Sequence, residues 1–141
     1  METDLFNVQL DQKLASQQEV YHYLAREIAE QSKLSPTEIV HKFLSRERVG
    51  NIQVAEKIIM PHFVAANVQN KIIVIRTQEM IPKWSDKIEE VRVILAIIMD
   101  SEAGKEEKLK LNHFLQNLMD PDFIRVLLNG ELQEILSLIH I

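Results

Sequence analysis

Residues Val91–Met99 read VRVILAIIM, and this apolar run decides the fold. Successive side chains of a strand point to opposite faces of a sheet, yet here both alternating sets are almost entirely apolar. A strand of this kind is covered on both faces, which favours the centre of a sheet. The unbroken apolar part, Val93 to Met99, is also far shorter than the roughly 20 residues that a membrane-spanning helix needs. The run therefore predicts a buried central strand.

A second strand is predicted upstream of this run. Lys71–Thr77 reads KIIVIRT, is rich in β-branched residues, and lies between a turn-like stretch at Asn67–Asn70 and a breaker at Pro82. Residues 54–60 form shorter strand-like pieces. Leu5–Leu10 alternates weakly and is interpreted as a short edge strand.

Two helices are predicted before the strands. Ser16 and Glu19 have the spacing of a capping box, in which the serine oxygen accepts from the Glu19 amide and the Glu19 carboxylate accepts from the Ser16 amide. That helix should run to about Gln31. A stronger start signal follows at Ser35–Glu38, with Pro36 at the first helical position, and Gly50 ends the second helix.

Helices are also predicted after the strands. Lys105–Met119 places leucines on one face, Asp120–Pro121 restarts the chain as N-cap and first helical residue, and residues 131–138 form the last helix. The order helix, helix, strands, helix, helix predicts an α/β layer fold with a central mixed sheet flanked by helices. With 141 residues, the chain is expected to be a single domain over residues 1–141.

Composition excludes several classes of function. The chain has no cysteine, so it offers no disulfide or thiolate chemistry. Its net charge of −5 argues against contact with nucleic acid. No segment has the length for membrane insertion, and the acidic N-terminus does not resemble a signal peptide, so a cytoplasmic location is expected. The five histidines show no zinc-site spacing, and no glycine-rich nucleotide loop occurs, so no metal or cofactor is expected.

His62 is the histidine best placed for chemistry. It follows a strand-like piece and Pro61, where a side chain can be both held and exposed, and the proline restricts Met60. A neutral imidazole has a nitrogen lone pair that can attack phosphorus. The alternative is a solvated histidine, or one bonded to a backbone carbonyl.

Arg46 is the natural companion of His62. A guanidinium can contact two oxygens of a phosphoryl group at once. Arg46 lies near the end of the second predicted helix, 16 residues before His62. Its alternative role is to complement the negative end of the helix dipole.

These motifs resemble the IIA domains of the fructose/mannitol class of the bacterial phosphotransferase system. In that family an Arg-Glu pair ends a helix, a short stretch of small residues follows, and an apolar strand ends in Pro-His. The matching residues here are Arg46-Glu47, Gly50 and Ile58–His62. The order of the predicted helices and strands agrees as well, from about Leu5 to Ile139.

The resemblance implies a phosphoryl carrier. His62 would accept the group from phospho-HPr and pass it to a cysteine of a IIB domain, and Arg46 would stabilise it. Because this chain has no cysteine, the IIB domain would be another chain or another part of a longer protein. The resemblance implies no cofactor.

The sequence departs from the family pattern at several positions. Phe63 replaces the usual glycine after Pro-His. Many members have a second histidine at the start of the leucine-rich helix, where the leucine register here places Glu107 or Lys108. Lys108 would contact a phosphate, whereas Glu107 would repel one. An apolar docking face is expected around the histidine, with Phe63, Val64 and Ile81 as its residues.

Two alternatives remain open. IIA-like domains also occur in transcriptional regulators controlled by the phosphotransferase system, where the phosphohistidine is a signal. The element Ile81-Pro82-Lys83-Trp84 resembles a Pro-Ile-x-Trp element of such regulators, in a changed order. Alternatively, the chain is an interaction module without phosphotransfer, and Arg46 and His62 are unrelated surface residues.

Overall fold

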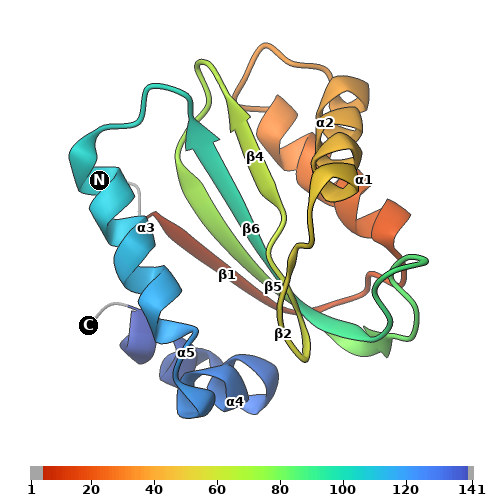
Figure 1. Cartoon of the computed structure of the whole chain (residues 1–141), viewed down its shortest axis with the longest axis vertical. Coiled ribbons are helices and arrows are strands. Elements are labelled where there is room, and N and C mark those ends of the chain that lie inside the picture. Colours follow the sequence, from red (N-terminus) through yellow and green to blue (C-terminus); the bar gives the residue numbers. More distant parts are fainter. Residues whose placement is uncertain (1–4, 140–141) are drawn as a thin grey trace.

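The computed structural model describes residues 5–139, which form a six-stranded sheet with helices on both faces (Figure 1). In chain order the elements are β1 (Phe6–Gln12), α1 (Gln17–Ala29), α2 (Pro36–Val49), β2 (Gln53–Ala55), β3 (Lys57–Ile59), β4 (His62–Ala65), β5 (Lys71–Ile81), β6 (Val91–Asp100), α3 (Lys105–Asn117), α4 (Pro121–Asn129) and α5 (Leu132–Ile139). The predicted α/β layer fold is confirmed.

The sheet is mixed, and β6 lies at its centre. The strand order is β1-β5-β6-β3-β2, with β4 also paired to β6. Strand β5 runs antiparallel to β6, whereas β3 and β4 both run parallel to it. The predicted edge strand at the N-terminus is confirmed as β1, which pairs parallel with β5.

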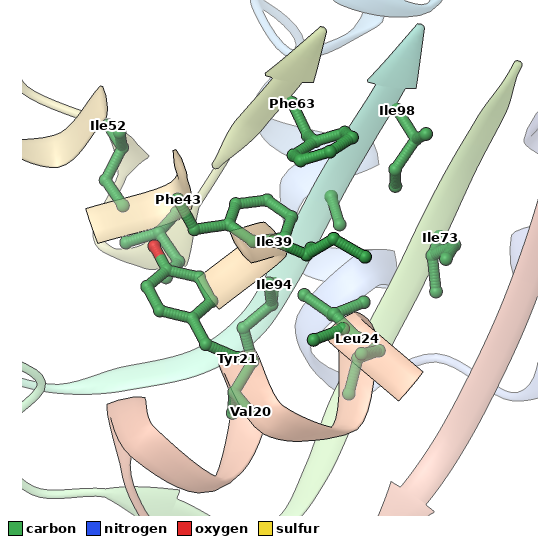
Figure 2. Packing of buried hydrophobic residues seen from close by; sticks show 14 of the residues in the cluster. Val20, Tyr21, Leu24, Ile39, Phe43, Ile52, Phe63, Ile73, Ile94 and Ile98 are labelled. Carbon is green, nitrogen blue, oxygen red and sulfur yellow. The ribbon is translucent and has the colours of Figure 1, made fainter. Parts of the chain in front are cut away.

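The two faces of β5 and β6 build two separate cores, because alternate residues point to opposite faces. Ile73, Ile94 and Ile98 pack against α1 and α2 in the cluster shown in Figure 2. Ile72 and Leu95 pack in the second cluster, under α3, α4 and α5. The prediction that Val91–Met99 is a central strand covered on both faces is therefore confirmed.

The helix starts agree with the sequence, with one correction. At α2 the full capping box forms between Ser35 and Glu38. At α1 the Ser16 oxygen accepts from the Glu19 amide, but the Glu19 carboxylate accepts from the amide of Ala15, not of Ser16. Ser16 has a more extended backbone than Ser35, with φ of −155° against −82°, and this presents the preceding amide instead.

Candidate functional site

An interruption between β3 and β4 creates the site. Both strands pair with β6, but Met60 and Pro61 between them belong to neither strand. The Met60 amide donates to the carbonyl of Ile52 at 2.7 Å, and Pro61 has no amide hydrogen to donate. His62 is the first residue of β4, and not the end of a strand as expected.

His62 lies on a sheet edge with its imidazole half-buried. In the described part of the chain, β4 pairs with β6 alone, and Figure 1 shows it between β6 and α2. Its neighbours Phe63 and Ala65 pack in the core under α1 and α2. Strand alternation therefore turns His62 and Val64 away from that core.

Burial and the positive charge of Arg46 both lower the pKa of His62, burial more strongly. The neutral imidazole is therefore the dominant form at pH 7, since an ordinary histidine already titrates near 6.5. Within residues 5–139 neither ring nitrogen forms a hydrogen bond with another residue. A neutral ring with an uncommitted lone pair is the form that a nucleophile requires.

Arg46 reaches the site from the last turn of α2. Its Nη1 donates to the carbonyl of Gly50 at 3.3 Å, which folds the side chain over the helix end. The segment that begins at Gly50 then runs to Ile52, whose carbonyl holds Met60. The charge of Arg46 acts on His62, so the structure brings the two predicted residues into one electrostatic environment.

Glu47 is a further residue of the site, to which the sequence motifs assign no individual role. Its carboxylate accepts from the Tyr21 hydroxyl, from Trp84 Nε1 at 3.2 and 3.3 Å, and from Gln17 Nε2 at 3.3 and 3.2 Å. A sequence signal for it exists, because Glu47 is the fourth residue after Phe43 and so continues the buried stripe of α2. A charge on such a stripe needs partners.

Lys108 lies apart from this constellation as the structure stands. It is exposed in the first turn of α3. No contact joins it to His62 in the described residues, and Arg46 is the charge that acts on the His62 pKa. Its role toward a phosphate stays a prediction.

The expected docking face needs a correction. Phe63 and Ile81 are only 2% and 1% exposed, because both belong to the core under α1 and α2. Phe63 packs on Phe43 with ring centroids 5.4 Å apart (Figure 2). Val64 is 56% exposed and does face outward. Val49, at the end of α2, is 82% exposed and was missed.

Chemically, the site offers one nucleophile and one adjacent cation. The neutral imidazole can attack phosphorus, and the guanidinium can contact the oxygens of the incoming group. Among residues 5–139 no three His, Asp or Glu side chains gather in a way that would hold a metal ion. None of the described helices combines the length and apolar composition needed to cross a bilayer. The arrangement places a half-buried histidine at the edge of a sheet, under the influence of the charge of an arginine.

The family follows from the sequence. Residues 3–140 match the family described as "Phosphoenolpyruvate-dependent sugar phosphotransferase system, EIIA 2". This chain therefore belongs to the IIA family of that system, as its motifs had indicated. A search among curated proteins gave no match.

Solved structures share the fold at low sequence identity. Nitrogen regulatory protein IIA-Ntr from Neisseria meningitidis has a TM-score of 0.76 and 19% identity, covering 96% of this chain and 95% of that one. IIA mannitol from Escherichia coli has a TM-score of 0.67 and 18% identity, covering 99% of each chain. The complex of the E. coli mannitol IIA enzyme with phosphorylated IIB has a TM-score of 0.65 and 18% identity, covering 96% of this chain and 99% of that one.

Proposed function

We propose that this chain carries phosphoryl groups on His62, accepting them from phospho-HPr and passing them to a cysteine of a IIB domain. The observation that carries the proposal is the half-buried imidazole of His62 at the start of the edge strand β4, with a pKa that burial and the charge of Arg46 lower. Membership in the IIA family supports it. So does the mannitol IIA neighbour, which was solved with phosphorylated IIB. The proposal includes a cytoplasmic location.

The transfer conserves atoms and charge in each step. A ring nitrogen of neutral His62 attacks phosphorus, a new N–P bond forms, and the bond from phosphorus to its carrier on HPr breaks with its electron pair. Arg46 contacts the phosphoryl oxygens while charge is spread over them. In the second step a IIB thiolate attacks phosphorus, and the N–P electron pair returns to His62.

The partner is proposed to dock on the apolar side chains that the structure leaves exposed near the site. Val64 follows His62 by two residues on the same face of β4. Val49 stands three residues beyond Arg46. Their burial by a partner would keep water from the phosphoryl group during transfer.

The test combines the chain with enzyme I, HPr and phosphoenolpyruvate, followed by intact mass and then by addition of a IIB domain. We expect one phosphoryl group on the parent chain, none on His62→Ala, and its loss when IIB is added. His41→Ala is the matched control, since His41 is an exposed histidine of α2. A parent chain that gains no phosphoryl group would leave the interaction module as the better description.

A regulatory domain is the second candidate, favoured by the position of Trp84. This tryptophan, from the element that resembles the regulators, is buried and donates to Glu47 beside Arg46. The phosphorylated site would then be linked to the surface loop after β5. The mixture of enzyme I, HPr, phosphoenolpyruvate and IIB also distinguishes the carrier from the regulatory domain, because a signalling domain would keep its phosphoryl group when IIB is added.

A further inference from the structure

We propose that Glu47 is a positioning residue, which holds the last turn of α2 so that Arg46 is directed toward His62. The inference deepens the proposed function and rests on it for its meaning. The test of the positioning role is independent of the carrier function, because it uses the unphosphorylated protein.

The carboxylate of Glu47 is a junction between separate parts of the chain. Gln17 and Tyr21 donate to it from α1, and Trp84 donates from the loop between β5 and β6. Hydrogen bonds to a charged acceptor are about twice as strong as neutral ones. Two of the donors are rigid, since Tyr21 is fully buried and Trp84 is 3% exposed.

The end of α2 has little else to hold it. Its fully buried side chains are Ile39 and Phe43, both well before the last turn. Beyond the partly buried Leu44, the next apolar residue is Val49, which is 82% exposed and packs on neither core. Apolar packing therefore does not fix the last turn, and the Glu47 carboxylate supplies the fixed point.

Adjacent residues of a helix point about 100° apart, because each turn takes 3.6 residues. When Glu47 points inward to Tyr21 and Trp84, the rotation of the turn is set, and with it the direction of Arg46. Arg46 then reaches the Gly50 carbonyl and acts on His62. The two adjacent residues thus have different roles: Arg46 acts on His62, and Glu47 fixes the turn of the helix that carries Arg46.

The donors to Glu47 are packed into the aromatic core, which gives the anchor its stiffness. Tyr21 stacks on Phe43 with ring centroids 4.8 Å and planes 7° apart (Figure 2). Trp84 meets Tyr21 edge-on at 5.4 Å. Burial, and then the charge of Glu47, raise the pKa of Tyr21, so that its hydroxyl stays protonated as a donor.

The experiment removes donors to Glu47 one at a time. Tyr21→Phe and Trp84→Phe each delete a donor and keep an aromatic ring. Tyr23→Phe is the matched control, since Tyr23 lies on the same helix but donates to Gln9. The readout is the pKa of the His62 ring from NMR titration of each unphosphorylated protein, with His62→Gln for assignment and thermal unfolding to verify the fold.

We expect Tyr21→Phe and Trp84→Phe to raise the His62 pKa toward its ordinary value, because Arg46 is no longer held in place. Tyr23→Phe should leave it unchanged. In an Arg46→Ala background, Trp84→Phe should have no further effect. Phosphorylation by phospho-HPr should slow by about tenfold in Tyr21→Phe and Trp84→Phe, since small misplacements of a positioned group are costly.

Glu47→Gln makes the sign of the shift decisive. Loss of position raises the His62 pKa, whereas the mere loss of a nearby negative charge lowers it. A lower pKa in Glu47→Gln, or equal shifts in Trp84→Phe with and without Arg46, would overturn the inference. If the pKa values move as expected and no form of the chain is phosphorylated, the positioning role stands and the carrier function fails.

Discussion

The backbone amide of Met60 donates to the carbonyl of Ile52, 2.7 Å away, and this bond ties the residue that follows β3 to the residue that precedes β2, just before His62. The next residue, Pro61, has no amide hydrogen, but its carbonyl accepts from the Ile97 amide of β6 at 2.9 Å. This dipeptide alone separates β3 from β4, which both pair with β6. His62 is presented on an edge strand whose position is fixed on both sides of the interruption.

Replacing Pro61 with alanine should therefore loosen the approach to His62. The variant frees Met60 from the restriction that a following proline imposes and adds conformational freedom to the unfolded chain. We expect the free energy of unfolding, measured in urea, to fall by about 1 kcal/mol. Phosphorylation should slow as well. A variant with unchanged stability and rate would show that the Met60–Ile52 bond alone fixes the interruption.

The lowered pKa of His62 predicts a pH dependence of stability. Because the pKa is lower in the folded chain, the unfolded chain binds the proton more tightly, and acid favours unfolding. Well above pH 6.5 His62 is neutral in both the folded and the unfolded chain and has no effect on the free energy of unfolding. The destabilisation grows as the pH falls through 6.5 toward the lower pKa of the folded chain.

The measurement compares the parent chain with His62→Gln by urea unfolding between pH 8 and pH 5. Titration of the other histidines cancels in the difference between the two proteins. We expect the parent to lose stability relative to His62→Gln as the pH falls. A constant difference, or a relative gain by the parent in acid, would contradict a lowered pKa.

Removing the guanidinium of Arg76 should lower the stability of the fold without changing the site around His62. This arginine of β5 is 9% exposed, and it donates to the carbonyl of Leu127 at 3.1 Å and to that of Gly130 at 2.7 Å, at the end of α4. Arg76→Met would leave two buried carbonyls unpaired, at a cost of about 3 kcal/mol. The His62 pKa should not change, since burial of the imidazole and the charge of Arg46 are the causes that lower it.

Arg92→Met is the control for Arg76. Arg92 is half-buried on β6 and donates to the carbonyl of Thr77 at 2.7 Å, so its removal should cost about 1 kcal/mol. Both values come from urea unfolding. Equal losses in the two variants would mean that the α4 end does not depend on Arg76.

The central strand was predictable because its evidence is local. Both alternating sets of Val91–Met99 are apolar, and this pattern needs no knowledge of the neighbours to indicate cover on two faces. The Ser35 cap was predictable for the same reason, since its partner lies three residues away. The prediction of a reciprocal bond at Ser16 was wrong because backbone angles, which the residue types do not specify, decide which amide donates to the Glu19 carboxylate.

The prediction that Phe63 and Ile81 belong to a docking face was wrong for a different reason. Phe63 is next to His62 in sequence, but neighbours on a strand point to opposite faces, so nearness along the chain implies separation in space. The pairing of Arg46 with His62 is non-local, and without the family resemblance only the two residue types suggested it. Glu47 was within reach of sequence reasoning, as a charge on the stripe that holds Phe43.

The exposed valine beside His62 gives the sharpest test of partner docking. Val64 is 56% exposed on the same face of β4 as His62, and a carboxylate placed there would have to lose its water when a partner buries it. Val64→Glu should therefore raise the KM for phospho-HPr by about tenfold or more, with little change in the pKa of His62. Leu132→Glu is the matched control, since Leu132 is 43% exposed on α5, which contacts β1 at the opposite end of the strand order from β4. The kinetics are followed by intact mass at several HPr concentrations. If the KM rises equally in both variants, added charge acts at long range, and Val64 does not mark the docking face.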